Sequence, residues 1–319
     1  MKTVSLPIVL SYLAIYIVWG STYFFIKMAV ATMPPFYLVG LRFFFGGLAF
    51  LIIAALTGKL KKVPKIKEIL SALFLGTLLL LLGNGLVSVG ERSVESYLAA
   101  LVISSTPLAV AFFNRLFFRE KLPWVRLLGI LCGISGVGVI LYNGTNLTTS
   151  LSAGIGLVLA GLCCWSLATS VGHRLPVHRN NLVNSGLQMF LAGIIGLIAS
   201  VCMYASPHTI LPQISMASWI GLAYLTVLGA LAFYCYAYLI GKEPSIRVAS
   251  YAIVNPLIAV GLGIVVGKEK PAPYLAFGAP LILAGLSLTL FVKKEPNPAH
   301  AEPGIEPLEV TEAERLNAQ

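Results

Sequence analysis

Aspartate is absent from this sequence of 319 residues, and charged residues of every kind make up only 11% of it. A soluble domain usually carries about 25% charged residues. No glutamate falls in the middle of an apolar run, and the four histidines lie at the edges of such runs or near the C-terminus. Enzymes need an acid–base pair or a cluster of metal ligands at one place in the fold. The sequence therefore predicts that the protein is not an enzyme and has no metal site and no cofactor.

Cysteine is also scarce, and none of the five cysteines has the spacing of a metal site or lies outside an apolar run. Thiols surrounded by lipid are not expected to form disulfides. A buried thiol usually packs as a small apolar residue, and that is the role expected for Cys132, Cys163, Cys164, Cys202 and Cys235.

Long apolar runs, by contrast, are abundant, and hydrophobic residues make up 58% of the chain. A run of about 18 or more apolar residues is long enough to cross the hydrocarbon core of a bilayer as a helix. The sequence predicts an all-α integral membrane protein with ten transmembrane helices and no room for a soluble catalytic domain. The expected spans are residues 6–27, 36–57, 69–90, 95–118, 123–142, 152–174, 181–204, 216–240, 246–267 and 271–292.

The net charge of +10 follows the predicted topology. If the N-terminus is cytoplasmic, 17 of the 22 lysines and arginines fall in segments on the cytoplasmic side and four on the opposite side. Cytoplasmic loops typically carry such an excess of basic residues. The partner indicated by this charge is the lipid bilayer, not nucleic acid, and both termini are predicted to be cytoplasmic. Residues 293–319 hold half of the glutamates and several prolines, which predicts a disordered cytoplasmic tail.

Two segments of the chain resemble each other. "SSTPLAVAFFNRLFFREK" (104–121) and "IVNPLIAVGLGIVVGKEK" (253–270) share a proline and a Glu-Lys pair at an offset of 149 residues. Earlier matches, such as Trp19 with Trp165, have an offset of 146. The chain is therefore predicted to form two five-helix repeats, residues 1–147 and 148–292. Because five is odd, the second repeat is inverted in the membrane, as in many secondary transporters whose substrate site lies between the repeats.

At these residues the sequence resembles the EamA-type branch of the drug/metabolite transporter superfamily, over about residues 6–292. The most specific pieces are "WGSTYFFIK" (19–27), "LRFFFGG" (41–47) and the proline-centred fourth and ninth helices, each ending in a Glu-containing corner. The resemblance implies a ten-helix basket in the bacterial inner membrane that exports small metabolites, often amino acids. It also implies a central cavity lined mainly by helices one, three, four, six, eight and nine. One departure is Gln188, which occupies the repeat position of Arg42.

Pro107 and Pro256 fall near the middle of their predicted helices. Proline lacks an N–H group and clashes with the carbonyl four residues earlier, so it kinks a helix. The carbonyls of Ile103 and Ala252 then need other partners, because an unpaired carbonyl in hydrocarbon is costly. Two interpretations remain open. The prolines are hinges whose freed carbonyls face the cavity, or they are packing kinks whose carbonyls accept from hydroxyls such as that of Thr106.

Aromatic residues form the predicted walls of the cavity. Trp19 and Trp165 are related by the repeat and lie away from the helix ends, and Tyr16, Trp19 and Tyr23 share one face of the first helix. Such surfaces suit an apolar or aromatic side chain and attract an ammonium group by cation–π interaction. Ordinary helix packing is the alternative role for the two tryptophans.

Asn84 and Asn255 are amides within predicted helices, and Asn255 shares a face with Tyr251. A lipid-facing amide is costly. Both side chains are therefore expected to face the interior, either at the substrate or in hydrogen bonds between helices. Tyr234 and Tyr238, one turn apart on the eighth helix, are further candidates for the substrate-binding wall.

Arg42 is the only charged residue well inside a predicted helix. An intramembrane charge marks a functional site by default. The interpretation that the sequence favours is nevertheless structural, with the side chain reaching outward or pairing with Glu91 or Glu95. Glu120 and Glu269, at helix corners, are expected to cap or anchor helices.

The function predicted from these features is secondary transport of small neutral or zwitterionic metabolites, with amino-acid export as the most specific expectation. Alternating access around the cavity is the expected mechanism, and no residue presents itself as a proton carrier. A sugar-phosphate or nucleotide-sugar exchanger is the alternative, although it needs cationic cavity residues. A non-transporting assembly partner is a further rival, because Gly129 and Gly133 form a G-x-x-x-G motif. The expected unit is a monomer that binds a small-molecule substrate.

Overall fold

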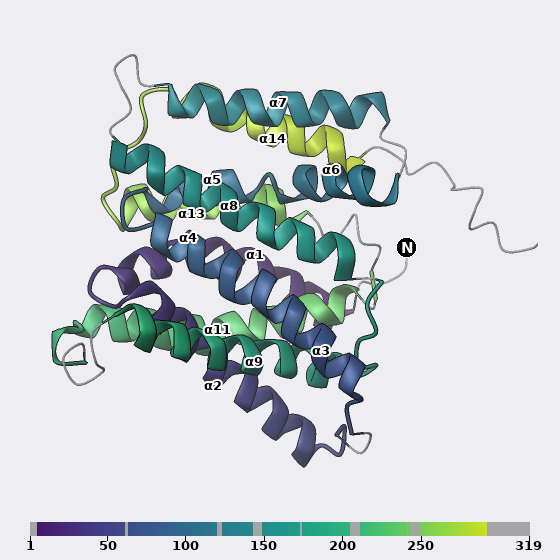
Figure 1. The fold of residues 1–319 in the computed structure, drawn as a ribbon. Coiled ribbons are helices and arrows are strands. Elements are labelled where there is room, and N and C mark those ends of the chain that lie inside the picture. Colours follow the sequence, from purple (N-terminus) through teal and green to yellow (C-terminus); the bar gives the residue numbers. More distant parts are fainter. Residues whose placement is uncertain are drawn as a thin grey trace, which may run out of the picture.

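The computed structural model describes residues 5–60, 63–119, 123–142, 149–172, 174–204, 211–240, 242–243, 248 and 250–291. Helices are the only regular structure in those residues, and the predicted all-α fold is confirmed (Figure 1). Within the described residues, seven spans are long and apolar enough to cross a membrane, and three shorter apolar helices accompany them. The uninterrupted helices are α1 (Leu6–Val30), α2 (Pro35–Leu56), α7 (Trp124–Leu141), α8 (Thr149–Gly172), α9 (Asn181–Met203), α11 (Met216–Ile240), α13 (Tyr251–Val265) and α14 (Leu275–Phe291), with a 3-10 turn, η2, at Leu211–Gln213. The predicted tail (293–319) and the predicted repeat boundary at 147/148 lie outside the described residues.

The distribution of side chains is that of a protein in lipid. Leu128, Leu131 and Ile134 form an exposed apolar stripe on α7, whereas Arg42 and Gln188 are buried. Large hydrophobic side chains are similarly exposed along most of the other helices, and many serines are buried. In a bilayer the apolar side chains face hydrocarbon, and polar groups gather where other protein groups can bond to them.

Two spans are interrupted near their middle. The third consists of α3 (Ile66–Leu75), a π-helix, η1 (Gly76–Gly83), and α4 (Asn84–Gly90). The fourth consists of α5 (Ser96–Ile103) and α6 (Thr106–Phe118), separated by a turn at residues 104–105. The repeat counterpart of the fourth span is α13, which by contrast continues through Pro256 as one helix.

Pro107 is therefore not in the middle of a helix, and that part of the sequence prediction is wrong. It lies in the first turn of α6, where a missing N–H costs nothing because no intrahelical acceptor is available to it. The carbonyl of Ile103 accepts a hydrogen bond from Thr106 Oγ1 at 2.6 Å. The hydroxyl-capped interpretation thus holds for this carbonyl.

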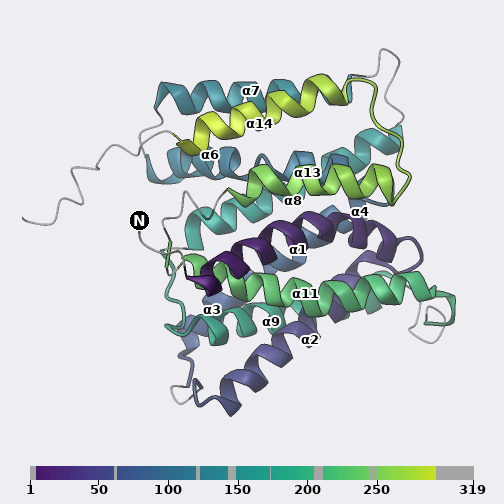
Figure 2. The same ribbon diagram turned by 180° about the vertical axis from the view of Figure 1, so that it is seen from behind.

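The packing of the helices follows the internal repeat. The second helices of the two halves, α2 and α9, pack against each other, and so do the fifth helices, α7 and α14. The first helix, α1, packs on α11 and α13, and its counterpart α8 packs on α3–α4 and α5–α6. In Figure 1, α1 begins at the right, near the N-terminus, and α8 begins at the left, after α7. The α7–α14 and α2–α9 pairs form opposite edges of the molecule, with the other helices between them (Figure 2).

Glycines allow close approach at both paired edges. A Cβ at Gly47 of α2 would overlap the Phe190 backbone of α9, and one at Gly193 would overlap that of Phe44. At the α7–α14 edge, a Cβ at Gly285 would lie 2.6 Å from the nitrogen of Gly133. The G-x-x-x-G motif is therefore used for packing inside the chain.

Gly47→Ala is expected to destabilise the protein by about 1–3 kcal/mol, because the added methyl group meets backbone that cannot move aside. Gly138→Ala is the control, since nothing lies within 4 Å of a Cβ at that position of α7. The control should melt at the wild-type temperature or above it, as alanine favours the helix. Thermal unfolding of the purified variants in detergent measures both effects, and equal melting temperatures for the two would contradict the tight α2–α9 contact.

Candidate functional site

A cavity lies between the two halves of the helical bundle. About 110 Å³ of it is available to the centres of water molecules, and a water needs roughly 10–15 Å³ by this measure. The cavity therefore has room for several waters or one small metabolite. All six helices that the resemblance implied contribute to its lining, as do α2 and α9.

The lining follows the repeat offsets. Beyond Trp19 with Trp165, the related pairs in the lining are Phe43 with Met189, Gly83 with Gly229, Asn84 with Ala230, Val87 with Phe233, Ile103 with Ala252 and Thr106 with Asn255. Each pair contributes one residue from each half. The cavity therefore lies on the axis that relates the halves.

Most of the residues predicted for the site line this cavity. They are Trp19, Tyr23, Arg42, Asn84, Trp165, Tyr251, Asn255 and Pro256.

Four predicted residues lie outside the lining of the cavity. Tyr16 is bonded through its hydroxyl to Ser250 Oγ at 2.6 Å. Tyr234 is 40% exposed beside Phe50, and Tyr238 lies one turn further along α11. Pro107 is also absent from the lining, whereas its neighbour Thr106 contributes to it.

Sequence reasoning missed Thr22, Met189 and Phe233 as lining residues. Thr22 lies one turn after Trp19 on the same face of α1. Met189 and Phe233 are the counterparts of Phe43 and Val87 at the 146-residue offset, and none of these four residues was predicted for the site.

An aromatic cluster supports one wall of the cavity. The Trp19 ring lies 5.0 Å from the Tyr251 ring, edge to face, and 5.1 Å from the Tyr236 ring. Such contacts add about 0.5–1.5 kcal/mol each beyond area burial, so Trp19 is held in place. On the other side, Trp165 lies against Gly83, where an added Cβ would approach the indole at 3.4 Å.

The two asparagines use their amide nitrogens on backbone carbonyls. Asn84 Nδ2 donates to the Leu79 carbonyl at 3.2 Å, across the end of the π-helix. The Asn255 amide faces three carbonyls, and with its nitrogen toward them it donates to Tyr251 and Tyr16 at 3.1 Å and to Ile15 at 3.3 Å. Asn255 therefore joins α13 to α1, as the interhelical interpretation predicted.

Arg42 faces the cavity as its one basic residue. It is 8% exposed, and its guanidinium carbon lies 4.9 Å from the centre of the Phe43 ring. The predicted pairing with Glu91 or Glu95 is wrong, because neither carboxylate forms an ion pair with Arg42 in the described structure. The lining of the cavity thus contains one cation.

Comparison with known proteins agrees with this arrangement. The sequence pattern of the EamA-like transporter family matches residues 6–142 and again residues 152–291. The chain belongs to the EamA-like transporter family. The inner membrane transporter YedA of Escherichia coli K12, itself described as uncharacterized, is 36% identical over 293 residues, which cover 89% of this chain and 91% of YedA.

Other relatives are more distant. A protein of Salmonella typhimurium LT2 described as a probable amino-acid metabolite efflux pump is 26% identical over 295 residues, which cover 88% of this chain and 93% of that protein. A solved crystal structure superposes with a TM-score of 0.61 at 18% identity, covering 88% of this chain and 95% of the other. This likeness shows that the two chains share a fold over most of their length.

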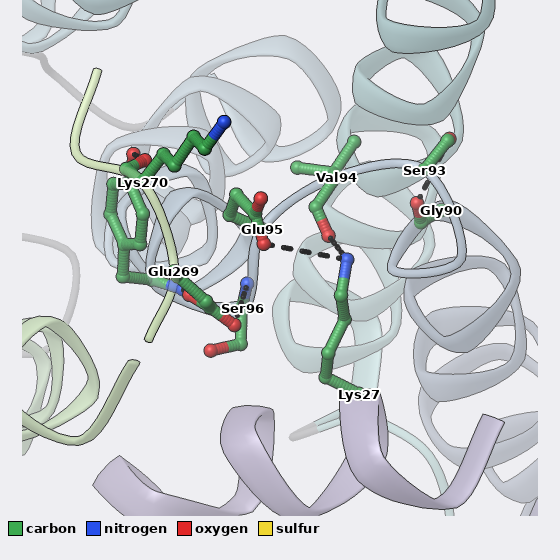
Figure 3. A network of polar contacts seen from close by, with 9 residues as sticks. Lys27, Gly90, Ser93, Val94, Glu95, Ser96, Glu269 and Lys270 are labelled. Carbon is green, nitrogen blue, oxygen red and sulfur yellow. Dashed lines mark hydrogen bonds and ion pairs between the residues drawn. The ribbon is translucent and has the colours of Figure 1, made fainter. Parts of the chain in front are cut away.

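A polar network covers one end of this EamA-like bundle (Figure 3). Lys27 Nζ of α1 donates to the Val94 carbonyl at 2.6 Å and lies 3.6 Å from Glu95. Glu269 accepts from the backbone N–H groups of Ser96 and Tyr97 at 3.1 and 3.4 Å. These are the free N–H groups at the start of α5, so Glu269 caps that helix across the repeats. Its repeat counterpart, Glu120, lies outside the described residues.

Glu91, directly after α4, is fully buried, and neither carboxylate oxygen has a hydrogen-bond partner among the described residues. Burial raises the pKa of the Glu91 carboxyl well above its usual range, and Glu269 adds to the rise while Lys27 opposes it. The Lys27 amino group already donates to the Val94 carbonyl and pairs with Glu95. Burial therefore favours the protonated, uncharged form of the Glu91 carboxyl.

Glu91→Gln is expected to stabilise the protein at neutral pH. A carboxyl whose pKa is higher in the folded state than in the unfolded chain lowers stability as pH rises above the ordinary glutamate value of about 4.3. Glutamine removes that penalty. The variant should melt above wild type at about pH 7 and converge with it near about pH 4.

Thermal unfolding in detergent across this pH range makes the comparison, with Glu95→Gln as the control. Glu95 is half-exposed beside Lys27, so its replacement should change stability by less than about 1 kcal/mol. An ionised, paired Glu91 would instead make the glutamine variant less stable at neutral pH.

Proposed function

We propose that the protein is a secondary transporter, not an enzyme, that exports small zwitterionic metabolites, most specifically amino acids. The observation that supports this function is the cavity lined by repeat-related pairs from both halves. A site on the axis between inverted repeats is exposed to either side of the membrane when the halves rock against each other. Alternating access is the mechanism that this arrangement supports.

The chemistry of the cavity suits an amino acid. Trp19, Trp165 and Phe233 present flat apolar surfaces to a side chain, and aromatic faces also attract an ammonium group. The volume admits one small molecule. The relative described as a probable amino-acid metabolite efflux pump supports the same substrate class.

Sugar phosphates fit less well. A phosphate dianion is usually held by several basic groups, and Arg42 is the only lysine or arginine among the residues that line the cavity. An assembly role through the G-x-x-x-G motif is also less suitable, because Gly133 packs against Gly285 of the same chain.

Counterflow in liposomes tests the function. Liposomes loaded with a mixture of unlabelled amino acids should accumulate at least one labelled amino acid faster than empty liposomes. Trp165→Ala removes a cavity wall and should reduce that rate about tenfold while folding stays near normal. Trp124→Ala is the control, because Trp124 is 68% exposed at the start of α7. Absence of counterflow for every amino acid would refute amino-acid transport, and failure of Trp165→Ala to fold would make that tryptophan a packing residue.

We also propose that the protein resides in the bacterial inner membrane with both termini in the cytoplasm, since YedA is an inner membrane transporter. Reporter proteins fused after residue 121 and after residue 270 should then report opposite sides of the membrane, cytoplasmic for the first and external for the second. Two fusions on the same side would contradict the inverted orientation of the repeats.

A further inference from the structure

We propose that Arg42 binds a carboxylate of the transported molecule and so requires the substrate to carry one. This inference rests on the proposed function and narrows it, because a neutral metabolite would leave the guanidinium without a partner. The surroundings of Arg42 and the partners of the nearby carboxyl groups support this role.

The guanidinium is placed to meet a ligand. Arg42 is more than nine-tenths buried and lines the cavity. Gly229 of α11 makes room for it, since a Cβ there would lie 3.1 Å from Nη2. Arg42 lies over the ring of Phe43 and interacts electrostatically with Tyr23, but no carboxylate among the described residues forms an ion pair with it. A buried charge without an anionic partner is strongly unfavourable, so a bound anion would stabilise the Arg42 guanidinium.

The neighbouring carboxyl groups do not neutralise Arg42. Glu95 is paired with Lys27, and Glu269 caps the start of α5 (Figure 3). Glu91 forms no ion pair with Arg42, and burial raises the pKa of its carboxyl, which favours the uncharged form. Because no described carboxylate pairs with Arg42, we expect its anion to come from outside the protein.

A carboxylate matches this site better than other anions do. One guanidinium presents two parallel N–H groups to a carboxylate, which satisfies a single negative charge. The second half places Gln188 at the corresponding position, and Gln188 does not line the cavity. The site therefore has one cationic pole, and the rest of the substrate lies against the aromatic walls.

Matched ligand pairs test the proposal on the purified full-length protein. The probes are acetate with acetamide, glycine with glycinamide and L-leucine with L-leucinamide, with glycerol 3-phosphate for phosphate esters. Carboxylates should raise the melting temperature and alter tryptophan fluorescence at constant ionic strength, and the amides should not. Arg42→Gln should weaken carboxylate binding about 10- to 100-fold. Arg42→Lys should restore part of the carboxylate binding, because the positive charge remains but the two parallel N–H groups of the guanidinium are lost.

Arg92→Gln is the control, because Arg92 is an exposed arginine outside the cavity. It should leave carboxylate binding unchanged. Stability without ligand gives a second readout. If Arg42 awaits a substrate, Arg42→Gln removes an unpaired buried charge and the variant melts a few degrees above wild type. If Arg42 is a structural residue, the variant melts below wild type.

Four results would overturn the proposal. The first is an equal effect of carboxylates and amides, and the second is unchanged carboxylate binding in Arg42→Gln. The third is an effect of glycerol 3-phosphate alone. The fourth is no effect of any carboxylate at about 100 times the millimolar concentration that marks the upper end of usual KM values. Counterflow separates this inference from the proposed function. Amino-acid counterflow that persists in Arg42→Gln would refute the role of Arg42 and leave amino-acid transport standing. Carboxylate binding that depends on Arg42, without any counterflow, would support the role of Arg42 and refute amino-acid transport.

Discussion

A backbone carbonyl that leaves its helix inside a bilayer must find another hydrogen-bond donor, because no water is available there. This constraint explains how the protein builds an irregular centre. Thr106 donates a hydrogen bond to the carbonyl of Ile103 where the fourth span breaks. Asn84 donates one to the carbonyl of Leu79 where the third span widens into a π-helix. Asn255 bonds to carbonyls of α1 from the neighbouring helix. These polar side chains thus stabilise the framework, and the ligand contacts that we propose are made by the aromatic residues and Arg42.

The halves of the chain share their architecture but differ in chemistry. Glycines bring α2 into close contact with α9 and α7 into close contact with α14, and the cavity lies between these two edges. Related pairs then line it from both sides. The exceptions to symmetry are informative: Arg42 faces the cavity and Gln188 does not. A symmetric frame with one charged pole gives a small molecule a defined orientation.

Much of the fold and part of the site were predictable from the sequence. Helix lengths follow from the apolar runs, since bilayer thickness fixes the length of a span. The offsets of 146 and 149 residues relate most of the lining residues in pairs, but they do not show which pairs face the cavity. The π-helix was not predictable, because "GTLLLLLG" is apolar apart from Thr77 and has no local signal for a wider turn. The environment of Arg42 was also out of reach, because it depends on how α2 is rotated against α11. The position of Tyr234 outside the cavity was not predictable either, because it depends on how α11 is rotated against its neighbours.

The residues before the two related prolines have a mechanical consequence. Ser104 and Ser105 precede Thr106 in the first half, and the chain turns there, with the Ser104 hydroxyl donating to the Leu101 carbonyl at 2.7 Å. Ile253 and Val254 occupy the equivalent places in α13, have no hydroxyl to offer, and the helix continues through them. The two related spans are therefore expected to bend differently. The fourth span can bend at the break before α6, whereas α13 has no break between Tyr251 and Val265.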